Sequence, residues 1–247
     1  IGLLLKRQTY WYVEVSILEN AKRNSASLAN IIAYALIGTI AFVIMKFEFP
    51  IIPGVGFLKF DFSDVIIVIG TIIFGAGPGI FIAFIRMLLS LVFSGFALPS
   101  LVGQTAAFLA SLSFALPFYF VTKNIKEKKN KSLKDYLLPV VGLIIGILAM
   151  TLLLALINAF ILTPVYAVTA VPNMPAINSY NGLLHFTEKV YLRQLLHLPS
   201  MKAYIFGIIV PFNLLKGTIN SIVIYVLFAT VLKNIKPFVR KHFNLKN

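Results

Sequence analysis

The chain has 247 residues, of which 59% are hydrophobic and 12% are charged, and its net charge at pH 7 is +14. Soluble domains carry roughly 25% charged residues because their surfaces must stay hydrated. That level is not approached here, and the apolar runs reach the roughly 20 residues needed to cross a bilayer. The composition therefore excludes a soluble globular domain and predicts an integral membrane protein in the cell membrane.

Metal and redox chemistry have few candidate residues in this chain. The sequence has no cysteine, so it forms neither a disulfide nor a thiolate metal site. Its three histidines, His185, His197 and His242, are scattered over connecting or terminal segments. We therefore expect no metal ion and no cofactor.

The positive charge is clustered along the chain rather than spread over it. Basic residues precede the first apolar run, fill one connection and close the chain; they are Lys6, Arg7, Lys22, Arg23, Lys123, Lys126, Lys128, Lys129, Lys131, Lys134, Lys233, Lys236, Arg240, Lys241 and Lys246. The positive-inside rule then predicts cytoplasmic N and C termini and a cytoplasmic connection at 123–134. No aromatic or glycine pattern accompanies the Lys run, so we expect no nucleic-acid partner.

Six apolar stretches predict a bundle of six transmembrane helices, an all-α fold. The stretches are 28–45, 64–74, 80–93, 101–122, 137–162 and 203–232. The second and third are short and are separated by the turn GAGPG, a pattern that in transporters often marks backbone lining a binding cavity. We expect one membrane domain over 28–235, preceded by an amphipathic or disordered leader at 1–27 and followed by a basic cytoplasmic tail at 236–247.

Two connections are long enough to have structure of their own. The segment 46–64 contains prolines, glycines and charges and is predicted to be an external loop. After the fifth span, Pro164 is predicted to stop the helix, and the link 165–200 follows. The middle of this link, LLHFTEKVYLRQLLHL, predicts a short helix on the membrane surface.

Polar side chains inside the spans are informative because they are costly in lipid unless they have a partner or line a wet cavity. The set comprises Arg86, Gln104, Thr105, Ser111, Asn158, Asn213, Lys216 and Asn220. Asn213 and Lys216 are three residues apart, so on a helix they share one face. Either they converge on a ligand, or Asn213 caps a kink near Pro211 while Lys216 pairs with Asp61 or Asp64.

Three further polar positions also allow two interpretations each. Asn158 contacts a ligand or makes an interhelical hydrogen bond. Arg86 is a ligand contact or an ion-pair partner. The loop residues Lys59, Asp61, Ser63 and Asp64 gate a cavity, pair with Arg86 or Lys216, or cap the second span, and for Asp64 we expect the cap.

Aromatic residues alternate with these polar loop positions. Phe57, Phe60 and Phe62 suit stacking on a flat heterocycle, but they are also ordinary residues for a membrane interface.

Catalysis is not expected. The chain lacks the G-x-x-x-x-G-K-[ST] pattern of a phosphate-binding loop, and GAGPG leads into an apolar span without a following Lys. The spans contain neither a Ser, His and Asp set nor a carboxylate pair that would indicate an intramembrane hydrolase. The alternative to a binding protein is a structural or assembly subunit without a ligand.

The motifs FLKFDFSD, FGAGPGI, VGQTAAFLASLSFALPFYF, NAFILTPVYA and VPFNLLKG, in order over about residues 28 to 235, resemble one family. They are similar to the substrate-binding S components of energy-coupling factor (ECF) transporters, and among these to the riboflavin-specific branch. The resemblance implies a six-helix bundle that captures a vitamin outside the cell. Its partners would be a transmembrane coupling subunit and two cytoplasmic ATPases.

The resemblance also assigns site residues by position. Asn158, Asn213 and Lys216 match family residues that hold the polar parts of riboflavin, and Leu58, Lys59, Phe60 and Asp61 match the lid over the pocket; Gln104 joins them as a polar residue within a span. S components for pyridoxine or hydroxymethylpyrimidine share the LKxDFS and PFNLL features and remain the alternative.

A small-residue face on the first span is the predicted contact with the coupling subunit. Close helix approach in lipid depends on small side chains. The residues are Ala29, Ala33, Ala35, Gly38 and Ala41, which could equally face lipid.

Overall fold

The computed structural model describes residues 28–51, 58–125, 132–171 and 176–232, together with 235, 238, 239 and 243. The predicted leader at 1–27 and most of the predicted tail at 236–247 lie outside the described residues. Within the described ranges, five helices are long and apolar enough to cross a membrane: Leu28–Met45, Ala76–Ser94, Leu98–Thr122, Leu133–Ala170 and Met201–Thr230. The all-helical membrane fold is thus confirmed.

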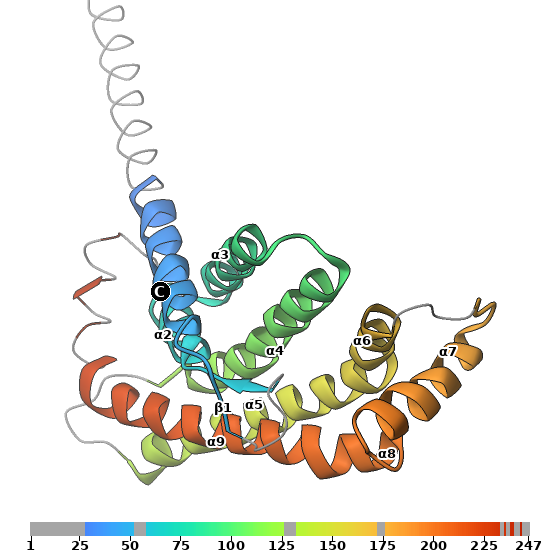
Figure 1. Ribbon diagram of the computed structural model, residues 1–247. Coiled ribbons are helices and arrows are strands. Elements are labelled where there is room, and N and C mark those ends of the chain that lie inside the picture. The colour runs from blue at the N-terminus through green and yellow to red at the C-terminus, as the bar shows by residue number, and fades with distance from the viewer. Residues whose placement is uncertain are drawn as a thin grey trace, which may run out of the picture.

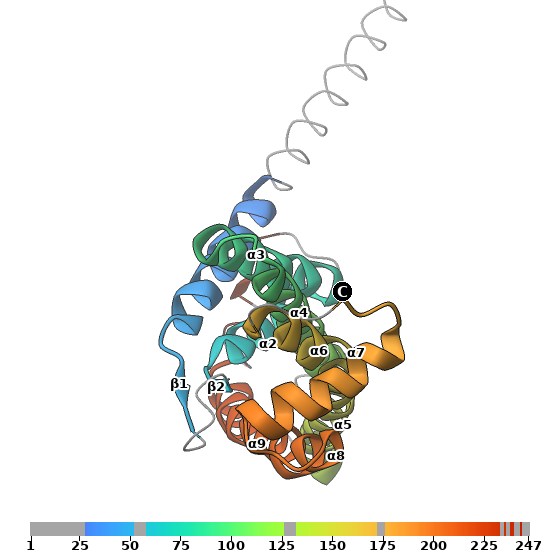
Figure 2. The same cartoon turned by 45° about the vertical axis from the view of Figure 1, so that its right-hand side comes forward.

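The second predicted span differs from a full crossing. It forms helix α2 (Ser63–Phe74), which has 12 residues and is too short to cross the hydrocarbon layer alone. α2 contacts α3 (Ala76–Ser94), α4 (Leu98–Thr122) and α9 (Val210–Leu227), and Figure 2 shows it in the middle of the bundle. Of the six predicted spans, five are therefore found as full-length candidates among the described residues, and the remaining one is the shorter apolar helix α2, which lies inside the bundle.

A tight turn joins α2 to α3. Gly75 adopts a φ of 104°, a conformation that side chains with a Cβ rarely reach. Gly75 therefore serves the reversal between two packed helices.

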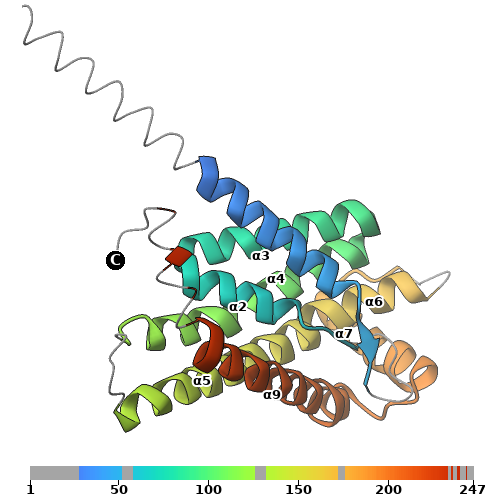
Figure 3. The same cartoon turned by 90° about the vertical axis from the view of Figure 1, so that its left-hand side faces the viewer.

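The predicted external loop forms a small antiparallel hairpin after the first helix. Strand β1 (Phe49–Pro50) pairs with β2 (Lys59–Phe60), with Phe49 opposite Phe60. Figure 3 shows β1 at the same end of the bundle as α6 and α7, away from the end of α4 and the start of α5. The hairpin thus lies over one mouth of the helix bundle.

The fifth span does not stop at Pro164, so that prediction was wrong. α5 (Leu133–Ile157) continues through a π-helical turn (Asn158–Leu162) into α6 (Thr163–Ala170). Pro164 has no N–H for the carbonyl of Phe160, which would be its partner in an α-helix. The Tyr180 hydroxyl donates to that carbonyl at an O···O distance of 2.6 Å, so the helix continues without an unsatisfied acceptor.

The link after this helix is itself largely helical, as the sequence predicted. α7 (Tyr180–Phe186) runs directly into a π-helical segment (Thr187–Leu195), and α8 (Met201–Tyr204) then leads through a second π-helical segment (Ile205–Ile209) into α9. Ser179 and Ser200 accept hydrogen bonds from the amides of Gly182 and Ala203. Serine caps therefore define where both helices begin.

The helix bundle is apolar both in its core and on its outer surface. Ile67, Ile82, Phe114, Phe118 and Ile224 are nearly inaccessible and form the centre of the core. Many large apolar side chains on the outer faces are exposed, including Leu152 and Phe206, a distribution expected when lipid replaces water outside. Figure 1 shows α5 and α9 running beside one another along one side of the molecule.

α4 and α5 approach each other closely at Gly146. A Cβ at this position would lie 2.6 Å from the backbone oxygen of Phe114, which cannot move without shifting α4. At Gly207 an added Cβ meets nothing within 4 Å. The two glycines provide a matched pair of positions.

We expect Gly146→Ala to lower the free energy of unfolding by about 1 to 3 kcal/mol, the usual cost of overpacking. Gly207→Ala should leave it nearly unchanged. Thermal unfolding of the purified protein in detergent, followed by helical circular dichroism, measures both. Equal midpoints for the two variants would contradict close contact between α4 and α5.

Candidate functional site: a polar cavity beneath the hairpin

A cavity of about 320 Å³ lies beneath the hairpin and between the helices. Side chains from the end of the first helix, the hairpin and α2 to α6 line it together with α9. They are Met45, Glu48, Leu58, Lys59, Asp61, Asp64, Arg86, Gly103, Gln104, Ala106, Ala107, Ala110, Met150, Leu154, Asn158, Leu162, Tyr166, Phe212, Asn213 and Lys216. The mixture of apolar walls and a few convergent polar groups is typical of small-molecule sites.

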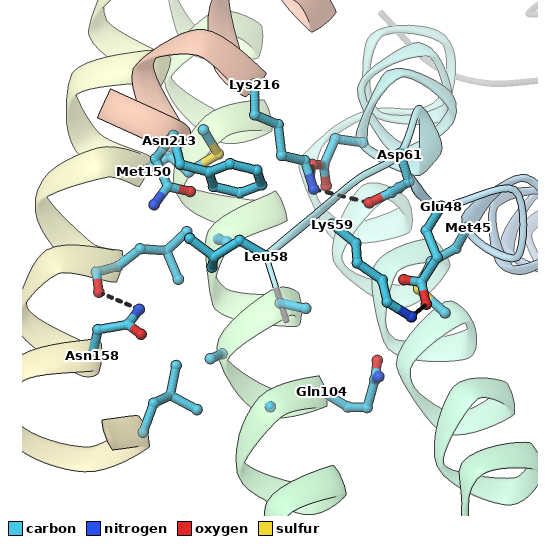
Figure 4. A pocket seen from close by; sticks show the side chains of 18 of the residues that line it. Met45, Glu48, Leu58, Lys59, Asp61, Gln104, Met150, Asn158, Asn213 and Lys216 are labelled. Carbon is cyan, nitrogen blue, oxygen red and sulfur yellow. Dashed lines mark hydrogen bonds and ion pairs between the residues drawn. The ribbon is translucent and has the colours of Figure 1, made fainter. Parts of the chain in front are cut away.

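Lys216 lies at the centre of the polar side of this cavity. Its Nζ is 2.9 Å from Oδ2 of Asp61 and 3.3 Å from Oδ2 of Asp64, and Figure 4 shows the pair with Asp61. The alternative in which Lys216 pairs with these carboxylates is thus realised, and Lys216 also lines the cavity. The two interpretations of Lys216 do not exclude each other.

Arg86 completes the charge network from α3. Its side chain is 2% exposed, its Nη1 donates to Ser63 Oγ at 3.0 Å, and it lies 3.6 Å from Oδ1 of Asp64. Asp64 also accepts a hydrogen bond from Ser111. The predicted helix cap at Asp64 was therefore wrong, because its carboxylate is drawn to two cations and a hydroxyl instead of the helix amides.

Asp61 connects the hairpin to α2 and α9. Its Oδ1 accepts from the Ser63 amide at 2.7 Å, and its backbone oxygen accepts from Asn220 Nδ2 at 3.5 Å. Burial raises the pKa of the Asp61 carboxyl, but the Lys216 ammonium and the hydrogen bond from Ser63 lower it more, so the net pKa lies below the ordinary value for Asp. Asp61 is therefore charged at neutral pH.

Two amide side chains face the cavity from different helices. Asn158 Nδ2 donates to the carbonyl of Leu154, and Asn213 Nδ2 donates to the carbonyl of Ile209, both at 2.8 Å. Each amide uses one N–H in this way, so a second N–H and an oxygen remain for a ligand. Figure 4 shows both side chains on the same side of the cavity, opposite Gln104.

The predicted lid residues do not all face the cavity. Leu58, Lys59 and Asp61 line it, and Lys59 pairs with Glu48 at 2.7 Å. Phe60 is buried outside the lining, between Phe49 and Phe62, with ring centroids 5.5 and 4.8 Å away. Successive strand residues point to opposite faces, which explains why Phe60 turns away from the cavity that Lys59 borders.

Several lining residues escaped the sequence analysis. Met45, Met150 and Phe212 are apolar residues within apolar runs, so no pattern distinguishes them. Tyr166 was missed because the helix was expected to end at Pro164; the continuation through Pro164 carries Tyr166 to the cavity wall. Glu48, which also lines the cavity, could have been predicted as the acidic partner of the loop residue Lys59.

The charges lining the cavity balance. Glu48, Asp61 and Asp64 oppose Lys59, Arg86 and Lys216. Among the described residues, no group of three or more His, Cys, Asp and Glu side chains could hold a metal ion.

The small residues of the first helix divide into two sets. Ala41 is fully buried in the core, and at Gly38 an added Cβ would lie 2.7 Å from Ile85 Cβ, so Gly38 allows close packing against α3. Ala29 is exposed, and Ala33 and Ala35 are partly exposed. Contact of the five residues with a coupling subunit stays a prediction, with Ala29, Ala33 and Ala35 the more accessible members.

A model of one protein family, described as the substrate-specific component of ECF transporters, matches residues 29–228. The chain therefore belongs to the family of ECF transporter substrate-specific components. It is a non-enzymatic, substrate-binding membrane subunit of an importer that works with a separate energizing module.

Particular relatives are riboflavin transporters. The chain is 30% identical to the riboflavin transporter FmnP of Bacillus subtilis (strain 168), over 85% of this chain and 94% of the relative. It is 32% identical to the riboflavin transporter RibU of Staphylococcus aureus (strain TCH60), over 87% and 96%. It also superposes on a solved structure of the S component of a bacterial ECF transporter, with a TM-score of 0.58, 30% identity and coverage of 85% and 98%.

Removal of Arg86 tests whether the buried charges depend on one another. We expect Arg86→Met to lower the free energy of unfolding by about 3 kcal/mol, because it leaves the buried carboxylates with too little positive charge. Adding Asp64→Asn to this variant should restore part of the loss, since the charges then balance again. Thermal unfolding in detergent is the measurement.

The exposed pair of Arg193 and Glu188, at 2.8 Å, provides the control. Arg193→Met should change stability by no more than about 0.5 kcal/mol, as is usual for surface pairs. If Arg86→Met were as stable as Arg193→Met, the buried network would have no structural role.

Proposed function

We propose that this chain binds riboflavin, or a closely related planar vitamin, in the cavity beneath the hairpin and delivers it for import. The observation that carries the proposal is that Asn158, Asn213 and Lys216, from two different helices, line one cavity in a chain whose relatives are riboflavin transporters. The volume of about 320 Å³ is at the small end of the range for ligand pockets, roughly 300 to 1,000 Å³.

The proposed binding mode uses amides for the polar edge of the ligand. Asn158 and Asn213 each present a free N–H and an oxygen, which suits a heterocycle with alternating donors and acceptors. An ammonium has three N–H bonds, of which Lys216 donates one to Asp61; with Asp64 as an ion-pair partner at 3.3 Å, at least one N–H stays available for the ligand. Gln104 would contact the opposite side of the ligand.

The apolar lining and the hairpin complete the proposed pocket. Met45, Met150 and Phe212 cover the flat faces of the ligand, where burial of apolar area contributes most of the affinity. Leu58 and Lys59 close the mouth as parts of a lid. The charges already balance within the site, which favours an uncharged vitamin.

Delivery would follow from a fixed orientation in the bilayer. The basic connection and both termini lie in the cytoplasm under the positive-inside rule, so the hairpin and the cavity mouth face outside. A transmembrane coupling subunit and two cytoplasmic ATPases would then supply the energy for release. Ala29, Ala33 and Ala35 are the residues proposed to approach that subunit.

Ligand titration tests the proposed substrate. Purified protein is titrated with riboflavin, pyridoxine and hydroxymethylpyrimidine, with flavin fluorescence or calorimetry as the signal. We expect tight binding of riboflavin alone, and a yellow preparation when flavin is retained. Binding of pyridoxine or hydroxymethylpyrimidine instead would change the substrate, and no binding of any vitamin would favour a structural subunit.

Substitutions test the assigned contacts. We expect Asn213→Ala and Lys216→Ala each to weaken riboflavin binding by about tenfold or more, since each removes a buried hydrogen bond to the ligand. Thr218→Ala is the matched control, because Thr218 lies on the same helix but is exposed and outside the lining. Unchanged affinity in both site variants would remove these residues from the site.

The absence of cysteine allows a clean test of orientation. We expect a membrane-impermeant maleimide to label Phe47→Cys in intact cells and to label Lys134→Cys only after the cells are opened. Both positions are exposed in the protein, one beside the hairpin and the other at the start of α5. The reverse pattern of labelling would invert the proposed topology.

A further inference from the structure

A second concavity lies on the outer surface of the protein, behind the vitamin cavity. It has a volume of about 690 Å³ and runs between the outer faces of α5, the helix formed by α7 and its π-helical extension, and the helix that begins at α8. Leu152, Leu156, Phe160, Phe206 and Leu214 line it, and all five are substantially exposed. This apolar groove therefore faces the hydrocarbon layer.

One end of the apolar groove is charged. Glu188 and Lys202 line that end. Glu188 accepts from Arg193 Nη2 at 2.8 Å and from the Met201 amide at 3.4 Å, which compensates its charge. Among the described residues Lys202 makes no ion pair. An exposed cation without an ion-pair partner therefore lies at one end of the apolar groove.

We propose that the apolar groove binds an anionic phospholipid, with an acyl chain along α5 and the phosphate at Lys202. The negative headgroup of such a lipid would pair with Lys202, and its acyl chain would lie along the apolar groove. A position near the start of a membrane helix is also where a lysine meets headgroups.

A transmembrane helix of another protein is a poorer match for the same surface. Helix pairs in lipid need small residues that allow the backbones to approach. The lining is mostly long aliphatic and aromatic side chains, with Ala155 and Ala159 as the two alanines. Such a rough surface suits a flexible chain better than a rigid helix.

The experiment uses tryptophan as a reporter of bound lipid. Trp11→Phe removes the one native tryptophan. Phe160→Trp then places a reporter in the groove, and Ile144→Trp places one on the same helix, about equally exposed but outside the lining. Each protein is reconstituted in phosphatidylcholine vesicles that contain a small fraction of brominated phosphatidylglycerol, whose bromines quench tryptophan on contact.

We expect Phe160→Trp to be quenched well beyond Ile144→Trp at the same lipid fraction. Adding Lys202→Gln should weaken that preference by roughly fivefold, the effect of one lysine beside an anionic headgroup. Lys134→Gln, an exposed lysine outside the groove, should have no effect. Helical circular dichroism and a single elution peak verify that every variant is folded.

Two results would overturn the proposal. Equal quenching at both positions would mean that the groove holds only the ordinary surrounding lipid. Weaker quenching at Phe160→Trp than at Ile144→Trp would mean that the groove excludes lipid, as a surface covered by protein would.

Discussion

The structure depends on four buried charges that neutralise one another inside an apolar bundle. Arg86 on α3, Asp64 on α2, Lys216 on α9 and Asp61 next to the hairpin form one continuous network. None of these groups could remain charged alone in such surroundings without a large cost in free energy. Their mutual pairing fixes how α2, α3 and α9 meet, and it creates the polar side of the cavity.

This network makes structure and binding two aspects of one arrangement. A lysine in a membrane span suggests a role in ligand binding. A lysine between two carboxylates suggests a role in stabilising the fold. Lys216 satisfies both descriptions, because it pairs with both carboxylates and also lines the cavity, and its ammonium has three N–H bonds of which one is donated to Asp61. The short helix α2 is tolerated in the bundle for a related reason, since its polar start is buried among partners instead of lipid.

Much of this organisation could be predicted from the sequence. Apolar run lengths located the helices, and the cost of polar groups in lipid singled out Asn158, Asn213, Lys216 and Gln104, all of which line the cavity. Family motifs added the class of protein. The residues that were missed, such as Met150 and Phe212, have no local signal, because an apolar residue facing a cavity looks the same in sequence as one facing lipid.

The errors came from local rules that tertiary contacts overrode. A proline usually ends a helix because the carbonyl four residues before it loses its hydrogen-bond donor. Here that carbonyl belongs to Phe160, and the hydroxyl of Tyr180, 16 residues after Pro164, donates to it instead. Asp64 caps a helix when no cation competes for it, and here two cations do. Phe60, assigned to the lid by position, does not line the cavity, because strand alternation directs its ring to the other face, where it is buried against Phe49 and Phe62; its role in a lid stays a prediction.

The π-helical turn at Asn158–Leu162 has a consequence for the cavity wall. Leu154, Asn158, Leu162 and Tyr166 line it at intervals of four. On a regular α-helix each such interval rotates the side chain onward by roughly 40°, so the fourth residue would point well away from the first. The π-helical turn has more residues per turn, so it offsets part of this rotation. The four side chains therefore keep facing the cavity along the length of the helix.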